Sequence, residues 1–199
     1  EASVPSLPGM IDAKDLDVPV EGGTGGVRYD GLRYFEDYKA GGRVHHHAGM
    51  TIEESEHAIA TRLYQNTAKV HFDARLMKES RTGKRLVYGG HVISIARSLT
   101  FAGLENALCI LAWNSGTHAN PIHAGDTIYA FTDILDAQPL GGRADAGALR
   151  LRLIATKDMD PATEDVLIRV VDQATNREMY NPCVVLDLDY WGMMPRREG

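Results

Sequence analysis

The apolar run from Val87 to Leu104 restricts the possible folds of this chain more than any other segment. The run is entered through Gly89-Gly90, and its apolar residues cover most of the circumference of a helix. A helix of this composition has to be buried, because its exposed surface would favour aggregation. The sequence therefore predicts one long helix inside the domain, with apolar positions Val92, Ile93, Ile95, Ala96, Leu99, Phe101 and Leu104.

Extended segments follow this helix. Runs with alternating or continuous apolar character, separated by Gly or Pro, occupy residues 108–113, 127–135, 149–157, 166–172 and 184–190. Such runs are typical of an antiparallel sheet. Helices followed by a meander of strands indicate an α+β domain, in which a curved antiparallel sheet wraps around one long apolar helix. This arrangement is the hot-dog fold, and the lack of an internal repeat predicts a single unit.

The first part of the chain divides into a connector and the start of the folded domain. Residues 1–31 are rich in Pro, Gly, Asp and Val without a sustained period, which is typical of a linker-like extended segment. Residues 32–199 are therefore assigned to the hot-dog domain. Within them, Thr51 followed by Glu54 has the spacing of a capping box, and this pattern predicts a helix from Ile52 to Tyr64.

The composition excludes several classes of partner. With 199 residues, 44% of them hydrophobic, the chain can form one well-packed domain. Its net charge of -6 at pH 7 does not fit the basic surface that nucleic-acid binding requires. No segment reaches the roughly 20 apolar residues of a membrane-spanning helix. We therefore expect a cytoplasmic protein that binds neither nucleic acid nor a membrane.

The cysteines and histidines do not have the spacing of metal ligands. Cys109 and Cys183 lie in apolar runs without a Cys-x-x-Cys spacing, so we expect two buried thiols. The consecutive histidines His45–His47 fall in a predicted strand, where neighbouring side chains alternate between faces and cannot converge on one ion. The remaining candidates, His91, His118 and His123, are scattered along the chain. We expect neither a metal nor a resident cofactor.

The segment with the most chemical information is Tyr64–Asp73, which reads Tyr-Gln-Asn-Thr-Ala-Lys-Val-His-Phe-Asp. Asn66 lies five positions before His71, where a predicted helix ends in a loop. An amide and an imidazole in such a place can bind one water molecule together and move its proton. From the residues alone, His71 could be a surface or a satisfied core histidine, and Asn66 could cap the helix or the turn that follows it.

This segment resembles the signature of the MaoC-like dehydratases and R-specific enoyl-CoA hydratases, Gly-Asp-x-Asn-Pro-aliphatic-His-x-Asp/Ser. Val70, His71 and Asp73 match the signature, and Asn66 stands in place of its catalytic aspartate. Two further segments resemble motifs of this family: Tyr88–His91, which leads into the apolar helix, and Asn120–Ile128, which is similar to a family turn and strand opening. The resemblance implies a hot-dog fold and hydro-lyase activity on an acyl-CoA.

Residues 32–158 resemble most closely the C-terminal half of the mesaconyl-CoA hydratases, also called β-methylmalyl-CoA dehydratases. Enzymes of this group carry two hot-dog halves in one chain, and their C-terminal half has Asn and His in the motif. The resemblance implies that water is added to or removed from the mesaconyl-CoA and β-methylmalyl-CoA pair. It also implies that residues 1–31 correspond to the linker between the halves.

Hydration of an unsaturated thioester assigns roles to the candidate residues. His71 is expected to carry the proton, because an imidazole titrates near ~6.5. Asn66 is expected to orient the water, because its amide has no titrating proton. The backbone N–H of Gly89 or Gly90, at a helix N-terminus, is expected to donate to the thioester oxygen.

Other residues are candidates for supporting roles. Because Asn66 cannot titrate, we expect a helper group, either Asp73 or a carboxylate or imidazole from another subunit. Arg62, Arg75 and Arg97 are candidate anchors for a substrate carboxylate or for the phosphates of CoA, since guanidinium groups bind both. The residues do not choose among these arginines.

Two other functions fit the same fold. One is hydrolysis of an acyl-CoA thioester, and the other is a non-catalytic half that binds acyl-CoA or stabilises a catalytic partner. A lone hot-dog sheet exposes an edge strand and an apolar flank. We therefore expect pairing with another hot-dog domain, as a homodimer or as a second half.

Overall fold

The computed structural model describes residues 32–197. The helical elements are η2 (Phe35–Asp37) and η3 (Lys69–His71), which are 3-10 helices, and the α-helices α1 (Glu54–Leu63), α2 (Ala74–Met77) and α3 (Gly89–Leu99). The strands are β1 (Arg43–Thr51), β2 (Ile110–His118), β3 (Thr127–Pro139), β4 (Ala146–Lys157), β5 (Arg169–Asp172), β6 (Arg177–Tyr180) and β7 (Val184–Pro195). The linker-like segment predicted for residues 1–31 lies outside the described residues.

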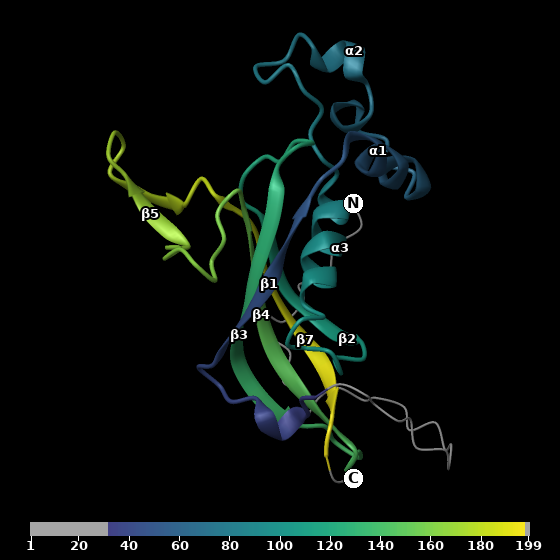
Figure 1. Cartoon of the computed structure of the whole chain (residues 1–199), viewed down its shortest axis with the longest axis vertical. Coiled ribbons are helices and arrows are strands. Elements are labelled where there is room, and N and C mark those ends of the chain that lie inside the picture. Colours follow the sequence, from purple (N-terminus) through teal and green to yellow (C-terminus); the bar gives the residue numbers. More distant parts are fainter. Residues whose placement is uncertain (1–31, 198–199) are drawn as a thin grey trace, which may run out of the picture.

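Five antiparallel strands form the main sheet in the order β1-β3-β4-β7-β2. The sheet curves around α3, while α1 and α2 lie together at one end of the molecule (Figure 1). The hot-dog fold predicted from the sequence is confirmed. Among the described residues, no helix combines the length and apolar character needed to cross a membrane.

The core lies between α3 and the sheet. From α3, Val92, Ile95, Ala96 and Leu99 are buried in one cluster with aliphatic residues of the strands, including Ile128, Leu151 and Leu188. Full burial of one such aliphatic side chain stabilises the fold by about 1.5–3 kcal/mol. The prediction of a buried central helix is therefore confirmed.

The central helix is shorter than its apolar run. It ends at Leu99, and the chain then turns through Gly103, whose φ of +103° lies in a region that other residues rarely adopt. A Cβ at Gly103 would lie only 2.4 Å from Cγ1 of Val44. Phe101, predicted as a core residue, is 71% exposed, whereas Leu104 returns to the core after the turn. The prediction was wrong for this last part of the run.

The predicted run 166–172 was wrong as a strand of the main sheet. Only Arg169–Asp172 is extended, and it pairs with β6 in a separate two-stranded sheet that projects from the main sheet (Figure 1). The Asp172 carboxylate accepts hydrogen bonds from the N–H groups of Ala174 and Thr175, at 2.7 and 3.0 Å. These local bonds tighten the turn, so the segment pairs with its own continuation. The other predicted runs became β2, β3, β4 and β7.

The predicted capping box is also wrong, although its helix is present. Thr51 is the last residue of β1, and its hydroxyl is hydrogen-bonded to that of Thr127 on β3 at 2.8 Å. The helix begins at Glu54 with Glu53 as its N-cap, and no side chain caps it. The local pattern predicted that the Thr51 hydroxyl caps the helix, but this hydroxyl is hydrogen-bonded to the neighbouring strand.

The predictions for cysteine and histidine had different outcomes. Cys109 is exposed just before the edge strand β2 and Cys183 is half-buried, so the prediction of two buried thiols is wrong. The histidines of β1 alternate as expected, because His46 is buried while His47 is exposed. Neighbouring strand residues point to opposite faces, which separates their imidazoles.

Candidate functional site

A cavity of about 710 Å³ lies at the N-terminal end of α3. Its size is typical of a site for a small molecule. The predicted site residues Asn66, His71, Gly89 and Gly90 all line it, although they come from two separate segments of the chain. The remaining lining residues are Leu86, Val87, Tyr88, Val92, Ile93, His118, Ala119, Asn120, Pro121 and Ile122.

The first turn of α3 offers free hydrogen-bond donors to the cavity. The N–H groups of His91 and Val92 donate to the carbonyl of Tyr88, at 2.9 and 3.3 Å. Within the described part of the chain, the N–H groups of Gly89 and Gly90 have no acceptor, and the Tyr88 side chain does not cap the helix. Free N–H groups at a helix N-terminus favour a negatively charged or polarised oxygen.

The two glycines leave room for neighbouring rings. A Cβ on Gly89 would lie 2.6 Å from Nε2 of His118, and one on Gly90 would lie 2.6 Å from Cε1 of Tyr88. Contacts this short would push either ring away. The glycine pair therefore allows two rings to lie directly against the helix N-terminus.

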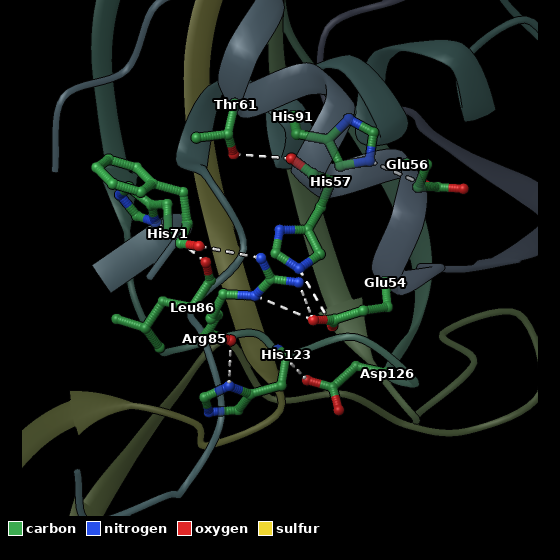
Figure 2. Close-up of polar contacts among 11 residues, drawn as sticks. Glu54, Glu56, His57, Thr61, His71, Arg85, Leu86, His91, His123 and Asp126 are labelled. Atoms are coloured by element: carbon green, nitrogen blue, oxygen red, sulfur yellow. Dashed lines mark hydrogen bonds and ion pairs between the residues drawn. The ribbon is translucent and has the colours of Figure 1, made fainter. Parts of the chain in front are cut away.

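The tautomer of His71 follows from its backbone partner. Nδ1 lies 3.0 Å from the carbonyl oxygen of Leu86 (Figure 2). A carbonyl oxygen only accepts, so Nδ1 carries the proton and Nε2 of the neutral ring keeps its lone pair. The N–H of Leu86 in turn donates to the carbonyl of Val70 at 3.0 Å. The half-buried ring also meets the edge of the Tyr88 ring, with 5.9 Å between centroids.

Asn66 both shapes its turn and lines the cavity. After α1 ends, Gln65 adopts a φ of 52°, and the N–H of Asn66 donates to the carbonyl of Thr61 at 3.0 Å. Its Oδ1 accepts from the N–H of Ala68 at 2.9 Å, which fixes the orientation of the amide. Nδ2 has no hydrogen-bond partner among residues 32–197. The amide is therefore available to the cavity as a donor.

Comparison with known protein families shows to which family this chain belongs. A family model described as mesaconyl-CoA hydratase matches residues 44–165. The chain belongs to the mesaconyl-CoA hydratase family. The matched range includes every residue that lines the cavity.

Individual proteins of known name are also similar to this chain. A β-methylmalyl-CoA dehydratase from Chloroflexus aurantiacus is 50% identical over 99% of the chain and 55% of its own length. A mesaconyl-CoA hydratase from Cereibacter sphaeroides is 47% identical over 98% of the chain and 54% of its own length. A crystal structure described as a MaoC domain protein dehydratase from Chloroflexus aurantiacus superposes with a TM-score of 0.84 at 48% identity, and the match covers 98% of this chain and 54% of that one. The chain thus spans about half the length of these relatives.

The structure places the other predicted site residues outside the cavity lining. Asp73 is the N-cap of α2, where its Oδ1 accepts from the N–H of Leu76 at 2.9 Å. Arg62 and Arg75 are exposed on α1 and α2. Arg97 donates to the Tyr190 hydroxyl at 2.6 Å and lies over its ring, 5.0 Å from the centroid. These contacts occupy Asp73 and Arg97 in local structure.

His118 is the cavity residue that sequence reasoning missed. It ends β2, and its ring lies against Gly89. The residue as a whole is exposed, but neighbouring protein atoms desolvate the ring and lower the pKa of His118. Its position just before the motif that begins at Asn120 was the available signal. Asn120 itself holds the loop, because Nδ2 donates to the carbonyls of Asn181 and Val184, at 2.9 and 2.7 Å.

A polar network supports the segment that carries His71 (Figure 2). Arg85 Nε donates to the Glu54 carboxylate at 3.0 Å, and Nη1 donates to the carbonyl of Phe72 at 3.2 Å. The hydrogen bond from Arg85 lowers the pKa of Glu54, while burial lowers the pKa of His57, whose Nε2 lies 3.3 Å from Glu54. The network joins α1 to the segments on both sides of α2.

A second polar contact connects α1 to the central helix. His91 on α3 places Nε2 at 2.9 Å from the carboxylate of Glu56 on α1 (Figure 2). This contact holds α1 beside the first turn of α3, whose residues Gly89 and Gly90 line the cavity. The outer contacts therefore fix the position of the site without entering it.

Proposed function

We propose that this chain provides a site that adds water to, and removes it from, an α,β-unsaturated CoA thioester, with mesaconyl-CoA and β-methylmalyl-CoA as the substrate pair. One observation carries the proposal: a single cavity joins Asn66, His71 and the free N–H groups of Gly89 and Gly90 in a member of the mesaconyl-CoA hydratase family. The proposed reaction needs no resident cofactor, because the substrate itself carries coenzyme A.

Each group has a defined role in the hydration direction. Nε2 of His71 accepts a proton from water, and Nδ2 of Asn66 donates to the oxygen of the same water. The N–H groups at the start of α3 donate to the thioester oxygen as negative charge develops on it. Removing one such donor typically lowers the rate by about 10²–10³.

The segment 75–85 is proposed to bind the phosphates of CoA. It carries Arg75, Lys78, Arg81 and Lys84, which are exposed and have no ion-pair partner in the part of the chain that the structure describes. The segment leads directly into Leu86 and Val87 of the cavity wall. Such a group of unpaired cations attracts phosphate, even in a chain with a net charge of -6. This segment therefore replaces Arg62 and Arg97 as the proposed phosphate anchor.

We propose that a second hot-dog domain packs against the flank of α3 and β2. β2 is an edge strand of the sheet. Beside it, Phe101, Leu108 and Trp113 are 71%, 40% and 50% exposed. Exposed apolar side chains next to an unpaired strand edge are typical of a protein interface. The relatives are about twice as long as the chain, which is consistent with a second half of similar size.

The test is to mix the purified chain with mesaconyl-CoA and follow loss of the conjugated enoyl thioester absorbance. His71→Ala should lower kcat/KM by about 10²–10⁴, because the proton acceptor is lost. His123→Ala is the matched control. That imidazole also contacts a backbone carbonyl through Nδ1, at 2.9 Å from Arg85 O, but lies outside the cavity lining. Its activity should stay close to that of the wild type.

The same assay separates the competing functions. A thioesterase would release free CoA thiol while the enoyl double bond is still intact. Binding of the acyl-CoA without turnover, until a second hot-dog polypeptide is added, would identify a non-catalytic half. Equal activity of the wild type and His71→Ala would refute the proposed role of His71.

A further inference from the structure

We propose that His118 is a second acid/base residue of this site and transfers the proton at the α-carbon of the thioester, while His71 transfers the proton of water at the β-carbon. This inference rests on the proposed function and extends it. It supplies the helper that Asn66, with its non-titrating amide, leaves missing.

The position of His118 is fixed by its contact with α3. A Cβ built on Gly89 would lie 2.6, 2.9 and 3.1 Å from Nε2, Cε1 and Cδ2 of the imidazole. The ring therefore lies directly against the residue whose free N–H is proposed to bind the thioester oxygen. No larger side chain than hydrogen fits at Gly89 while the ring keeps this position.

The imidazole of His118 has no structural partner in the described residues. By contrast, His71, His91 and His123 each use a ring nitrogen to contact a carbonyl or a carboxylate. Hydrogen bonds within the fold therefore explain the positions of those three rings, but no such bond explains the position of the His118 ring. A ring with two free nitrogens against a helix N-terminus is available to a ligand.

Few other groups in the cavity can exchange a proton. No Asp, Glu, Lys or Arg is among the described residues that line it. Apart from the imidazoles, the titratable side chain of the lining is the phenol of Tyr88. The amide of Asn120 is occupied by its two backbone carbonyl partners. The composition of the lining therefore leaves His118 as the second imidazole beside His71.

The groups of the cavity can be assigned to successive atoms of an enoyl thioester. With the thioester oxygen on the N–H of Gly89, the α-carbon is one bond from the carbonyl carbon and the β-carbon is one bond further. His118 adjoins Gly89. His71 and Asn66 come from another segment that lines the same cavity, and the ring of His71 meets that of Tyr88, the residue before Gly89. The two imidazoles can therefore act on neighbouring carbons.

In the hydration direction, Nε2 of His71 takes a proton from water while the water oxygen forms a bond to the β-carbon. The π electrons of the C=C bond move into the thioester, and the enolate oxygen accepts from the N–H of Gly89. His118, which takes up a proton from solvent for this step, then gives it to the α-carbon and becomes neutral, and the imidazolium of His71 releases its proton to solvent. In dehydration, neutral His118 removes the α-proton and the imidazolium of His71 protonates the departing hydroxyl.

The experiment compares His118→Ala, His118→Gln and the wild type in hydration of mesaconyl-CoA. Both variants should lose about 10²–10⁴ in kcat, because a proton-transfer group is removed. Added imidazole should restore activity to His118→Ala in proportion to its concentration, and in D₂O the restored product should carry deuterium at the α-carbon. A purely structural role for the ring would not give this rescue.

Several results would overturn the inference. One is a kcat of His118→Gln equal to that of the wild type. Another is a failure of imidazole to restore activity to His118→Ala. The third is that the variants bind a saturated CoA thioester more weakly but keep the wild-type kcat. His47→Gln, a change at an exposed histidine on β1, is the matched control and should behave as the wild type. If the wild type itself does not hydrate the substrate, the proposed function fails first, so the two failures are distinguishable.

Discussion

Mild acid should destabilise the fold through His46. The ring is 1% exposed, its Nδ1 lies 2.8 Å from the carbonyl oxygen of Ala102, and its Nε2 lies 2.8 Å from the Thr132 hydroxyl. Because a carbonyl only accepts, Nδ1 carries the proton and Nε2 accepts from the hydroxyl, so both nitrogens are used by the neutral ring. Burial lowers the pKa of His46 from 6.5 to about 4.

The direction and size of the effect follow from proton linkage. Between pH 6.5 and about pH 4, the unfolded chain binds a proton at residue 46 that the native state does not bind. The free energy of unfolding therefore falls as the pH is lowered through this window. At about 1.4 kcal/mol per pKa unit, the full contribution is about 3 kcal/mol, of which about 2 kcal/mol is lost by pH 5.

Urea unfolding at pH 7.5 and pH 5 measures this contribution. We compare the difference in unfolding free energy between the two pH values for the wild type, for His46→Gln and for His47→Gln. The glutamine at position 46 lowers stability at both pH values, but the difference between them should shrink by about 2 kcal/mol. The exposed neighbour His47 should leave the difference unchanged. An equal difference in the wild type and His46→Gln would refute the reasoning.

Three further changes test the site and its surroundings. Gly89→Ala should lower kcat for hydration by at least about tenfold without unfolding the domain, because the new methyl group displaces the His118 ring; unchanged kcat would contradict the contact. Lys78→Glu with Lys84→Glu should raise KM for the CoA thioester but not for its pantetheine analogue; equal effects on both would exclude phosphate binding there. Trp113→Glu should convert a paired wild-type assembly to monomers in sedimentation, and an unchanged mass would place the interface elsewhere.

The fold was predictable from local patterns, because its core element has a strong local signal. The apolar residues of α3 cover most of its circumference, so a surrounding sheet was the expected solution. The errors lie where a distant residue decides the outcome. The Thr51 hydroxyl is hydrogen-bonded to that of Thr127 across the sheet. The chain leaves the central helix and turns where Gly103 packs against Val44. Neither contact has a signature in the neighbouring sequence.

The candidate site was predictable in part for the same reason. Asn66 and His71 share one short segment, and Gly89 and Gly90 open a recognisable helix, so each pair has a local pattern. For His118 the local signal was limited to its position just before the motif at Asn120, because its ring meets Gly89 only in the folded chain. Asp73 shows the opposite error. It lies near His71 in sequence, but capping of α2 turns its carboxylate to the backbone.

The partner of His71 has a consequence for how this site can change by mutation. The basic nitrogen is selected by the main-chain oxygen of Leu86, and the main-chain N–H of the same residue is bound to Val70. A carbonyl is present whatever side chain stands at position 86. Single substitutions there can alter the packing of the cavity wall, but they cannot remove the group that sets the tautomer. Substrate preference could therefore drift at this position while the proton acceptor is preserved.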